Sequence, residues 1–189
     1  MKLKLLLIVM VTGLAAQAQT SWTIDKSHSN IRFTATHMLI TDVDGEFRNF
    51  DATMVGSSDD FDGAQVEFSA QVASINTGNE RRDGHLKSDD FFNAEKFPEI
   101  SFKGTIEKEG ADYFLVGDFT MRDVTKKVKF DLDYNGTMNM GETTKAGFKV
   151  TGTVDRFEYG LKWDRAIETG GLVVGKEIEI TCNVQMDSK

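Results

Sequence analysis

The chain has 189 residues, of which 30 are acidic and 22 are lysine or arginine, so its formal net charge is −8 at pH 7. A surface this acidic repels nucleic acids and anionic membranes, and we expect neither as a partner. The single cysteine, Cys182, excludes an internal disulfide bond. The fold must therefore be stable through its own hydrophobic core.

The first eighteen residues have the pattern of a cleaved export signal. Lys2 and Lys4 precede an apolar run over residues 5–14, and the small residues Ala16 and Ala18 fit the site that signal peptidase recognises. This run is shorter than the roughly 20 residues that a membrane-spanning helix needs. The sequence therefore predicts cleavage near Ala18, one domain over residues 19–189 without a stable membrane anchor, and a periplasmic or secreted location.

Apolar and polar residues alternate with a period of two along most of the remaining chain. The clearest run lies at residues 64–74, whose apolar positions are Val66, Phe68, Ala70 and Val72. This alternation predicts a strand with these four side chains facing the interior. Similar runs lie at residues 31–36, 45–54, 100–106, 113–121, 127–134, 147–154 and 176–185. Turn-forming residues between the runs indicate an antiparallel meander of about eight strands.

We expect these strands to close into a barrel rather than a sandwich, because closure removes exposed strand edges. Two interpretations of its interior stay open at this point. One is a packed core, and the other is a cavity. Small residues interleaved among the large apolar ones favour the cavity: Ala35, Ala70, Gly104, Gly117 and Gly152. In that case a phenylalanine at position 70 should fill the cavity and exclude a ligand.

Residues 79–92 break the alternation and are dense in charge. We expect a short helix or a structured loop here, placed between two strands and capping one end of the barrel. The segment also contains Leu86, Phe91 and Phe92, which are costly to expose to water. These three side chains should therefore pack onto the barrel end or against a bound ligand.

Two polar clusters could form a rim around the mouth of the barrel. Residues 81–83 with His85 form the first, and residues 122–127, which begin with Arg122, form the second. One interpretation is that Arg82, His85 and Arg122 contact the head group of a ligand. The other is that these are solvated loops, tied to the barrel through a pair between Asp83 and an arginine.

The sequence has no pattern that is typical of a catalytic or metal centre. His28, His37 and His85 have no close histidine or cysteine partner, whereas a zinc site needs three or four ligands, usually with local pairs. Cys182 lies on the apolar side of an alternating run and should be a buried, inert thiol. Nucleophile-elbow and glycine-rich phosphate motifs do not occur. We therefore predict no enzyme, no catalytic residue, no metal and no cofactor.

Five stretches, in this order, resemble the YceI family of polyisoprenoid-binding, lipocalin-like proteins: residues 22–33 followed by His37-Met38, 45–47, 77–102, 117–126 and 155–160. The third is the most specific, with Arg81-Arg82-Asp83-Gly84-His85-Leu86 at its centre. One departure is Asp123, where many relatives have glycine, and it puts in doubt only a contact of this turn with a head group.

The resemblance implies an all-β, antiparallel, eight-stranded lipocalin-like barrel with a short helical insert that caps one end. It also implies a bacterial periplasmic protein that carries or stores a long-chain isoprenoid, either an isoprenoid quinone or a polyprenyl compound, in a hydrophobic tunnel. The acidic charge of the chain favours a neutral head group over a pyrophosphate. A homodimer is compatible with the sequence.

Combining the alternation with the resemblance gives fourteen predicted ligand-binding residues: Phe33, Ala35, His37, Phe68, Ala70, Val72, Arg82, His85, Leu86, Phe91, Phe92, Phe102, Phe119 and Arg122. Two other functions stay open. One is an enzyme that acts on isoprenoid lipids with a histidine as general base. The other is a packed, stress-induced structural barrel without a ligand.

Overall fold

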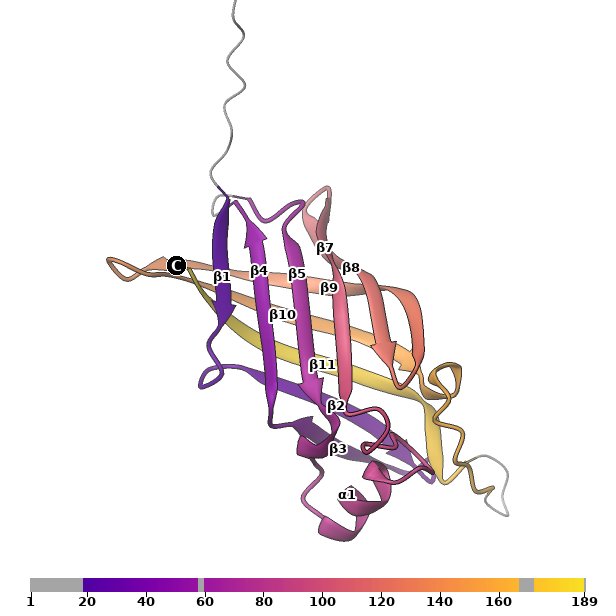
Figure 1. The fold of residues 1–189 in the computed structure, drawn as a ribbon. Coiled ribbons are helices and arrows are strands. Elements are labelled where there is room, and N and C mark those ends of the chain that lie inside the picture. Colours follow the sequence, from indigo (N-terminus) through magenta and orange to yellow (C-terminus); the bar gives the residue numbers. More distant parts are fainter. Residues whose placement is uncertain (1–18, 58–59, 167–171, 189) are drawn as a thin grey trace, which may run out of the picture.

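The computed structural model describes residues 19–57, 60–166 and 172–188, and the predicted export signal at residues 1–18 lies outside this range. The described chain is almost entirely β (Figure 1). Its strands are β1 Thr20–Ile24, β2 Asn30–His37, β3 Thr41–Phe47, β4 Phe50–Gly56, β5 Gln65–Gln71, β6 Ile75–Asn76, β7 Glu99–Glu109, β8 Asp112–Met121, β9 Val124–Asn139, β10 Thr144–Asp155 and β11 Val174–Ser188. The helices are the α-helix α1 Glu80–Lys87 and the 3-10 helices η1 Val72–Ser74 and η2 Arg156–Tyr159.

Eight of these strands form a closed antiparallel barrel, which confirms the predicted fold class. They follow one another in the order β1-β4-β5-β7-β8-β9-β10-β11, and β11 pairs with β1 to close the wall. Strand β11 is long enough to pair twice. Its end, at Met186, lies opposite Ile24 of β1, and its earlier part pairs with β2. Strands β2, β3 and β6 thus continue the wall beyond β1, β4 and β5.

Three short breaks separate β1, β4 and β5 from the strands that continue the wall beyond them. They are residues 25–29 between β1 and β2, residues 48–49 between β3 and β4, and η1 between β5 and β6. The first break is held by Asp25, whose carboxylate accepts hydrogen bonds from the Ser27 main chain and hydroxyl and from His28 Nδ1. These hydrogen bonds hold the pKa of Asp25 well below its usual range. The histidine at this position therefore has a structural partner in the turn.

The interior register predicted for residues 64–74 is confirmed. Val66, Phe68 and Ala70 face the barrel interior, while Gln65 and Glu67 are exposed. Strand β5 is shorter than predicted, because it ends at Gln71 and η1 follows. The main-chain N–H of Val72 donates to the carbonyl of Pro98 (2.8 Å), and its side chain is buried there without belonging to the strand.

Three glycines that the sequence analysis assigned to a cavity do something else. Gly104 and Gly117 lie opposite each other on β7 and β8, and a Cβ atom on either would come within 2.8 Å of the Phe102 ring. A Cβ on Gly152 would lie 2.2 Å from the Phe130 ring. These glycines therefore let phenylalanine rings lie flat against the backbone, and the expectation that they enlarge a cavity was wrong.

The two ends of the barrel are closed differently. One end of the barrel carries the β4–β5 turn. There Phe61 packs edge-on against Trp22, Tyr134 and Phe148, with ring centroids 5.0–5.5 Å apart. At the opposite end lies α1 (Figure 1), as predicted for this segment. Asn79 caps the helix by accepting a hydrogen bond from the Arg82 N–H. Among the described residues, no helix is long and apolar enough to span a membrane.

Candidate ligand cavity

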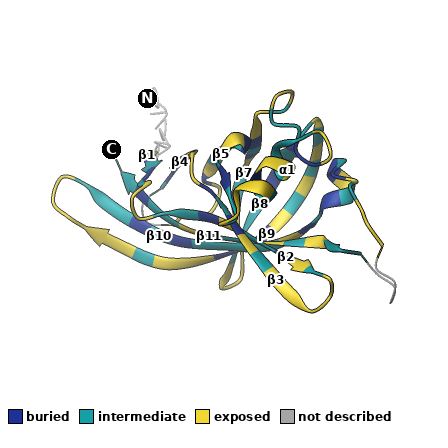
Figure 2. Cartoon of the chain, turned by 90° about the horizontal axis from the view of Figure 1, so that it is seen from below, coloured by how far each residue is buried: buried dark blue, intermediate teal, exposed yellow. Residues whose placement is uncertain are grey.

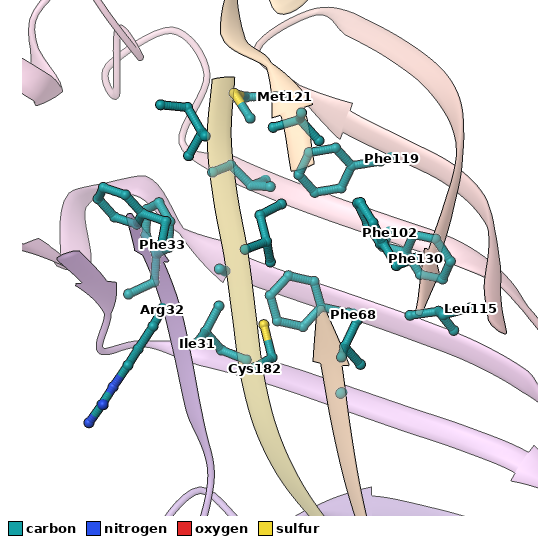
Figure 3. Close-up of a pocket in the computed structure, with 18 of the residues that line it drawn as sticks. Ile31, Arg32, Phe33, Phe68, Phe102, Leu115, Phe119, Met121, Phe130 and Cys182 are labelled. Carbon is teal, nitrogen blue, oxygen red and sulfur yellow. The ribbon is translucent and has the colours of Figure 1, made fainter. Parts of the chain in front are cut away.

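The barrel encloses an apolar cavity. Its volume is about 200 Å³, counted as the space that the centre of a water molecule can occupy. A site for one water needs only about 10–15 Å³ by this measure, so the space is much larger than a packing defect. Phenylalanine, leucine, isoleucine and valine side chains from strands on all sides point into it (Figure 3). The interior is therefore a lined cavity rather than a fully packed core.

Nine of the fourteen predicted site residues line this cavity: Phe33, Ala35, Phe68, Ala70, Leu86, Phe91, Phe92, Phe102 and Phe119. They come from β2, β5, β7, β8 and the segment around α1. The alternation found them because inward-facing positions of a barrel strand share one parity. Contact of these residues with a ligand stays a prediction.

The other five predicted residues lie outside the cavity wall: His37, Val72, Arg82, His85 and Arg122. Val72 is buried in η1, and His37 ends β2, where it pairs with Thr41 and Val174. The His85 Nε2 atom lies 2.9 Å from a carboxylate oxygen of Asp90. None of these five lines the cavity, although the His85 ring packs edge-on against Phe91 of the wall, with centroids 5.0 Å apart.

Arg82 holds the main chain just before α1. Its Nε and Nη2 atoms donate to the hydroxyl and the carbonyl of Thr77, both at 2.7 Å. Asp83, which is buried, accepts from the N–H and the hydroxyl of the same threonine at 2.9 and 2.6 Å. Arg82 and Asp83 thus both hydrogen-bond to Thr77. Asp83 pairs with this threonine rather than with the arginine that the sequence suggested.

Arg122 holds the segment that follows α1. It occupies the left-handed region in the turn between β8 and β9, with φ at 56°. Its Nη1 atom donates to the carbonyls of Phe91 (2.7 Å) and Gly160 (3.1 Å), and its guanidinium lies over the Phe97 ring. Arg122 therefore connects the segment after α1 to the β8–β9 turn and to the chain at Gly160.

Sequence reasoning missed Arg156 as a site residue. It is almost fully buried in η2 and lines the cavity. Its guanidinium donates to four main-chain carbonyls, those of Leu161, Trp163, Val174 and Gly175, at 2.6–3.0 Å. Burial lowers its pKa from the usual range. Among the described residues, no carboxylate accepts a hydrogen bond from this guanidinium. A buried arginine that hydrogen-bonds to main-chain carbonyl groups leaves no pattern in the sequence.

Several apolar wall residues were also missed, among them Ile31, Val150, Ile178, Ile180 and Val184. Their parity along β2, β10 and β11 was the available signal. Cys182 lies between them on β11 and faces the cavity, as the alternation predicted. Burial raises the pKa of its thiol to about 12. The thiol is thus protonated and unreactive at neutral pH.

No polar group of this wall is arranged for chemistry. Arg32 borders the cavity, but its guanidinium points away from it (Figure 3). Carbonyl groups already accept hydrogen bonds from four of the five N–H donors of Arg156. Within residues 19–57, 60–166 and 172–188, no group of three or more histidine, cysteine or acidic side chains could hold a metal ion.

The chain matches a protein family along most of its length. The YceI-like domain covers residues 22–186, almost the whole described chain. The chain belongs to the YceI-like family. This confirms the resemblance seen in the sequence.

Relatives and solved structures agree with this assignment. A UPF0312 protein of Staphylococcus aureus strain USA300 is 35% identical over 168 residues, which cover 88% of this YceI-like chain and 96% of that protein. The YceI protein of Campylobacter jejuni is 27% identical with a TM-score of 0.67, covering 82% of this chain and 90% of that one.

Two more distant structures show the same fold. BcnA of Burkholderia cenocepacia has a TM-score of 0.72 at 18% identity, over 86% of this chain and 98% of that chain. A polyisoprenoid binding domain from Saccharophagus degradans, implicated in plant cell wall breakdown, has a TM-score of 0.66 at 12% identity, over 89% and 98%.

Proposed function

We propose that this YceI-like protein binds a long-chain isoprenoid lipid in its barrel cavity and carries or stores it in the periplasm. The observation that carries the proposal is the barrel cavity with an almost wholly apolar wall. The fold shared with a polyisoprenoid binding domain supports the same class of ligand. The proposed periplasmic location rests on the export signal predicted for residues 1–18.

The energetics favour a flexible hydrocarbon. Each methylene group that moves from water into an apolar site contributes about 0.8 kcal/mol. Affinity should therefore rise with the number of isoprene units until the cavity is full. The phenylalanines and branched aliphatic side chains of the wall supply shape and dispersion contacts, which need no chemical reaction.

The wall favours a neutral head group. Arg156 is a buried cation at the cavity, and carbonyl groups occupy four of its five N–H donors. Arg82 and Arg122 hold main-chain atoms instead of facing the cavity. A pyrophosphate would bring several negative charges to a chain whose net charge is already −8. We therefore propose an isoprenoid quinone or alcohol as the ligand.

A quinone titration tests the proposal. Trp163 packs 5.3 Å from the ring of Phe91, which lines the cavity, so a bound quinone should quench tryptophan fluorescence. The cavity is filled by Cys182→Phe, because this small side chain faces the empty space near the middle of β11. We expect quinone affinity to fall at least tenfold while the melting temperature changes little.

The matched control is Asn183→Phe, one residue further along β11, where the side chain is exposed and donates a hydrogen bond to Asn30 on the neighbouring strand. It should bind quinone like the wild type. Val150→Phe, opposite Cys182 on β10, replaces the first variant if that one does not fold. Equal quinone affinity in the wild type and in a folded, cavity-filled variant would rule out the cavity as the binding site.

A further inference from the structure

The turn between β2 and β3 exposes three large apolar side chains in a row. Met38, Leu39 and Ile40 are 42%, 63% and 83% exposed. Apolar side chains on a surface are common one at a time, but three adjacent ones at the tip of a hairpin are not explained by the fold. We call residues 38–40 the hairpin tip.

The backbone of the hairpin tip does not suit these residues. Met38 and Leu39 both occupy the left-handed region, with φ at 54° and 64°. Glycine and asparagine adopt this conformation readily, and large side chains do so rarely. The turn is nevertheless well defined, because the Met38 N–H donates to the Val173 carbonyl (2.9 Å) and the Ile40 N–H to the His37 carbonyl (3.2 Å). Local folding therefore does not select apolar residues here.

The hairpin tip lies beside the cavity wall. Ala35 on β2 lines the cavity three residues before the tip. Val174, which also lines it, directly follows the residue that accepts the Met38 hydrogen bond. Figure 1 shows the β2–β3 hairpin on the α1 side of the barrel, away from the aromatic closure near the β4–β5 turn, and Figure 2 shows its exposed outer surface. The hairpin tip thus lies close to the cavity wall, with only Thr36 and His37 between it and Ala35 on β2.

Size and charge decide which partner fits. A stable protein interface buries about 800 Å² on each partner, far more than three side chains at a convex turn can offer. Apolar side chains flanked by polar ones are well suited to dip into the interface of a lipid bilayer. Residues 36–44 carry Asp42 and Asp44 and no lysine or arginine, so the hairpin does not favour anionic lipids.

We propose that the hairpin tip inserts into the surface of a neutral, zwitterionic lipid bilayer and docks the barrel there. The inference rests on the proposed function, since docking would let an insoluble lipid pass between bilayer and cavity without crossing water. Leu39 and Ile40 are the side chains that enter the membrane, and the acidic remainder of the chain keeps the contact reversible.

The test is flotation with phosphatidylcholine vesicles, using protein made from the full-length chain so that all variants share one N-terminus. The variant Leu39→Asn with Ile40→Ser removes the apolar tip, and asparagine suits the left-handed backbone, so the fold should be retained. The control Met138→Ser with Met140→Ser changes two methionines at the β9–β10 hairpin, which are 64% and 60% exposed. We expect the tip variant to lose at least tenfold in vesicle partitioning and the control to match the wild type.

Equal partitioning of the tip variant and the wild type would overturn the inference. So would wild-type binding that occurs only with phosphatidylglycerol vesicles and disappears in salt, because that pattern reports charge. Extraction of bound lipid from the same preparations keeps the two claims apart. A tip variant that retains its lipid but floats like the wild type refutes docking alone, whereas a wild type that carries no lipid and takes up no added isoprenoid refutes the proposed function.

Discussion

Three arginine side chains near α1 mainly hydrogen-bond to main-chain carbonyl groups. Arg82, Arg122 and Arg156 each donate hydrogen bonds to carbonyl groups of neighbouring segments. The guanidinium group can do this because it has five N–H donors in a planar fork. A lysine offers no such fork, so we do not expect it to replace an arginine at these positions.

Arg82→Ala should lower stability and leave ligand affinity unchanged. The change removes two 2.7 Å hydrogen bonds to Thr77 that lie at the half-buried base of α1. Hydrogen bonds of charged groups are worth about 1.5–3 kcal/mol when buried, so we expect a loss of about 1–2 kcal/mol in the free energy of unfolding. Urea unfolding and quinone titration on one preparation measure both quantities, with the exposed Arg81→Ala as control. Weaker quinone binding at unchanged stability would instead support a head-group contact.

The reactivity of Cys182 should report its place in the cavity. Burial raises the pKa of the thiol to about 12, so the reactive thiolate fraction in the folded protein should grow about tenfold per pH unit up to pH 10. The rate of alkylation by iodoacetamide measures this fraction, and circular dichroism checks that the fold persists. In guanidinium chloride the exposed thiol should reach a plateau near its ordinary pKa. A plateau near pH 9 in the folded protein would place the thiol in water.

At the scale of elements, α1 and the residues after it form a cap made of one helix and a tied loop. Leu86, in the last turn of α1, and Phe91 and Phe92 after it face the cavity. Phe92 packs edge-on against Phe47 of β3, with centroids 6.1 Å apart. The cap therefore closes the wall where β6 ends, and a ligand that enters at this end has to displace it.

Leu86→Ala should speed ligand release. The substitution removes half-buried apolar contacts between the cap and the cavity, and we expect it to cost about 1–2 kcal/mol in stability, less than a full core truncation. The rate of quinone dissociation, followed by stopped-flow fluorescence, should rise several-fold. Lys87→Ala, the next residue on α1, is the matched control. An unchanged dissociation rate in Leu86→Ala would mean that the ligand leaves elsewhere.

The alternation predicted most of the elements because a barrel strand places every second residue inside. It could not place the breaks in the wall, since they depend on tertiary contacts such as the hydrogen bond from Val72 to Pro98. It also misassigned Gly104, Gly117 and Gly152. Whether a small residue leaves a space or receives a ring from a neighbour depends on cross-strand packing, which periodicity does not contain.

The same limit affects the proposed cavity-filling site. Ala70 lies on the cavity side of β5, as predicted, but it is only 1% exposed between Phe50 and Ile100 of the neighbouring strands. A phenylalanine there would overpack the wall rather than fill the cavity. Cys182 is partly buried, its side chain faces the cavity, and it is the better position for a cavity-filling substitution. The charged residues around α1 were equally ambiguous in sequence, because one composition fits both a head-group contact and a tie to the main chain.

At the scale of the whole molecule, the fold class and the family could be predicted from sequence, and the existence of the cavity could not. Closure of the barrel follows from the number of strands and their patterning, and the family motifs extend across the chain. A cavity is a small difference between the volume that the wall encloses and the volume that its side chains fill. That difference is decided by rotamers and packing, as at Phe102 and Phe130, which lie over glycines instead of filling the centre.

Organic extraction of the purified protein, followed by mass spectrometry, tests most directly whether the cavity holds an isoprenoid. The wild type should release an isoprenoid quinone or polyprenyl alcohol at close to one molecule per barrel. Cys182→Phe, purified in the same way, should release at least tenfold less, and Asn183→Phe should match the wild type. An empty wild type that also takes up no added isoprenoid, or equal lipid content in the wild type and the cavity-filled variant, would contradict the account.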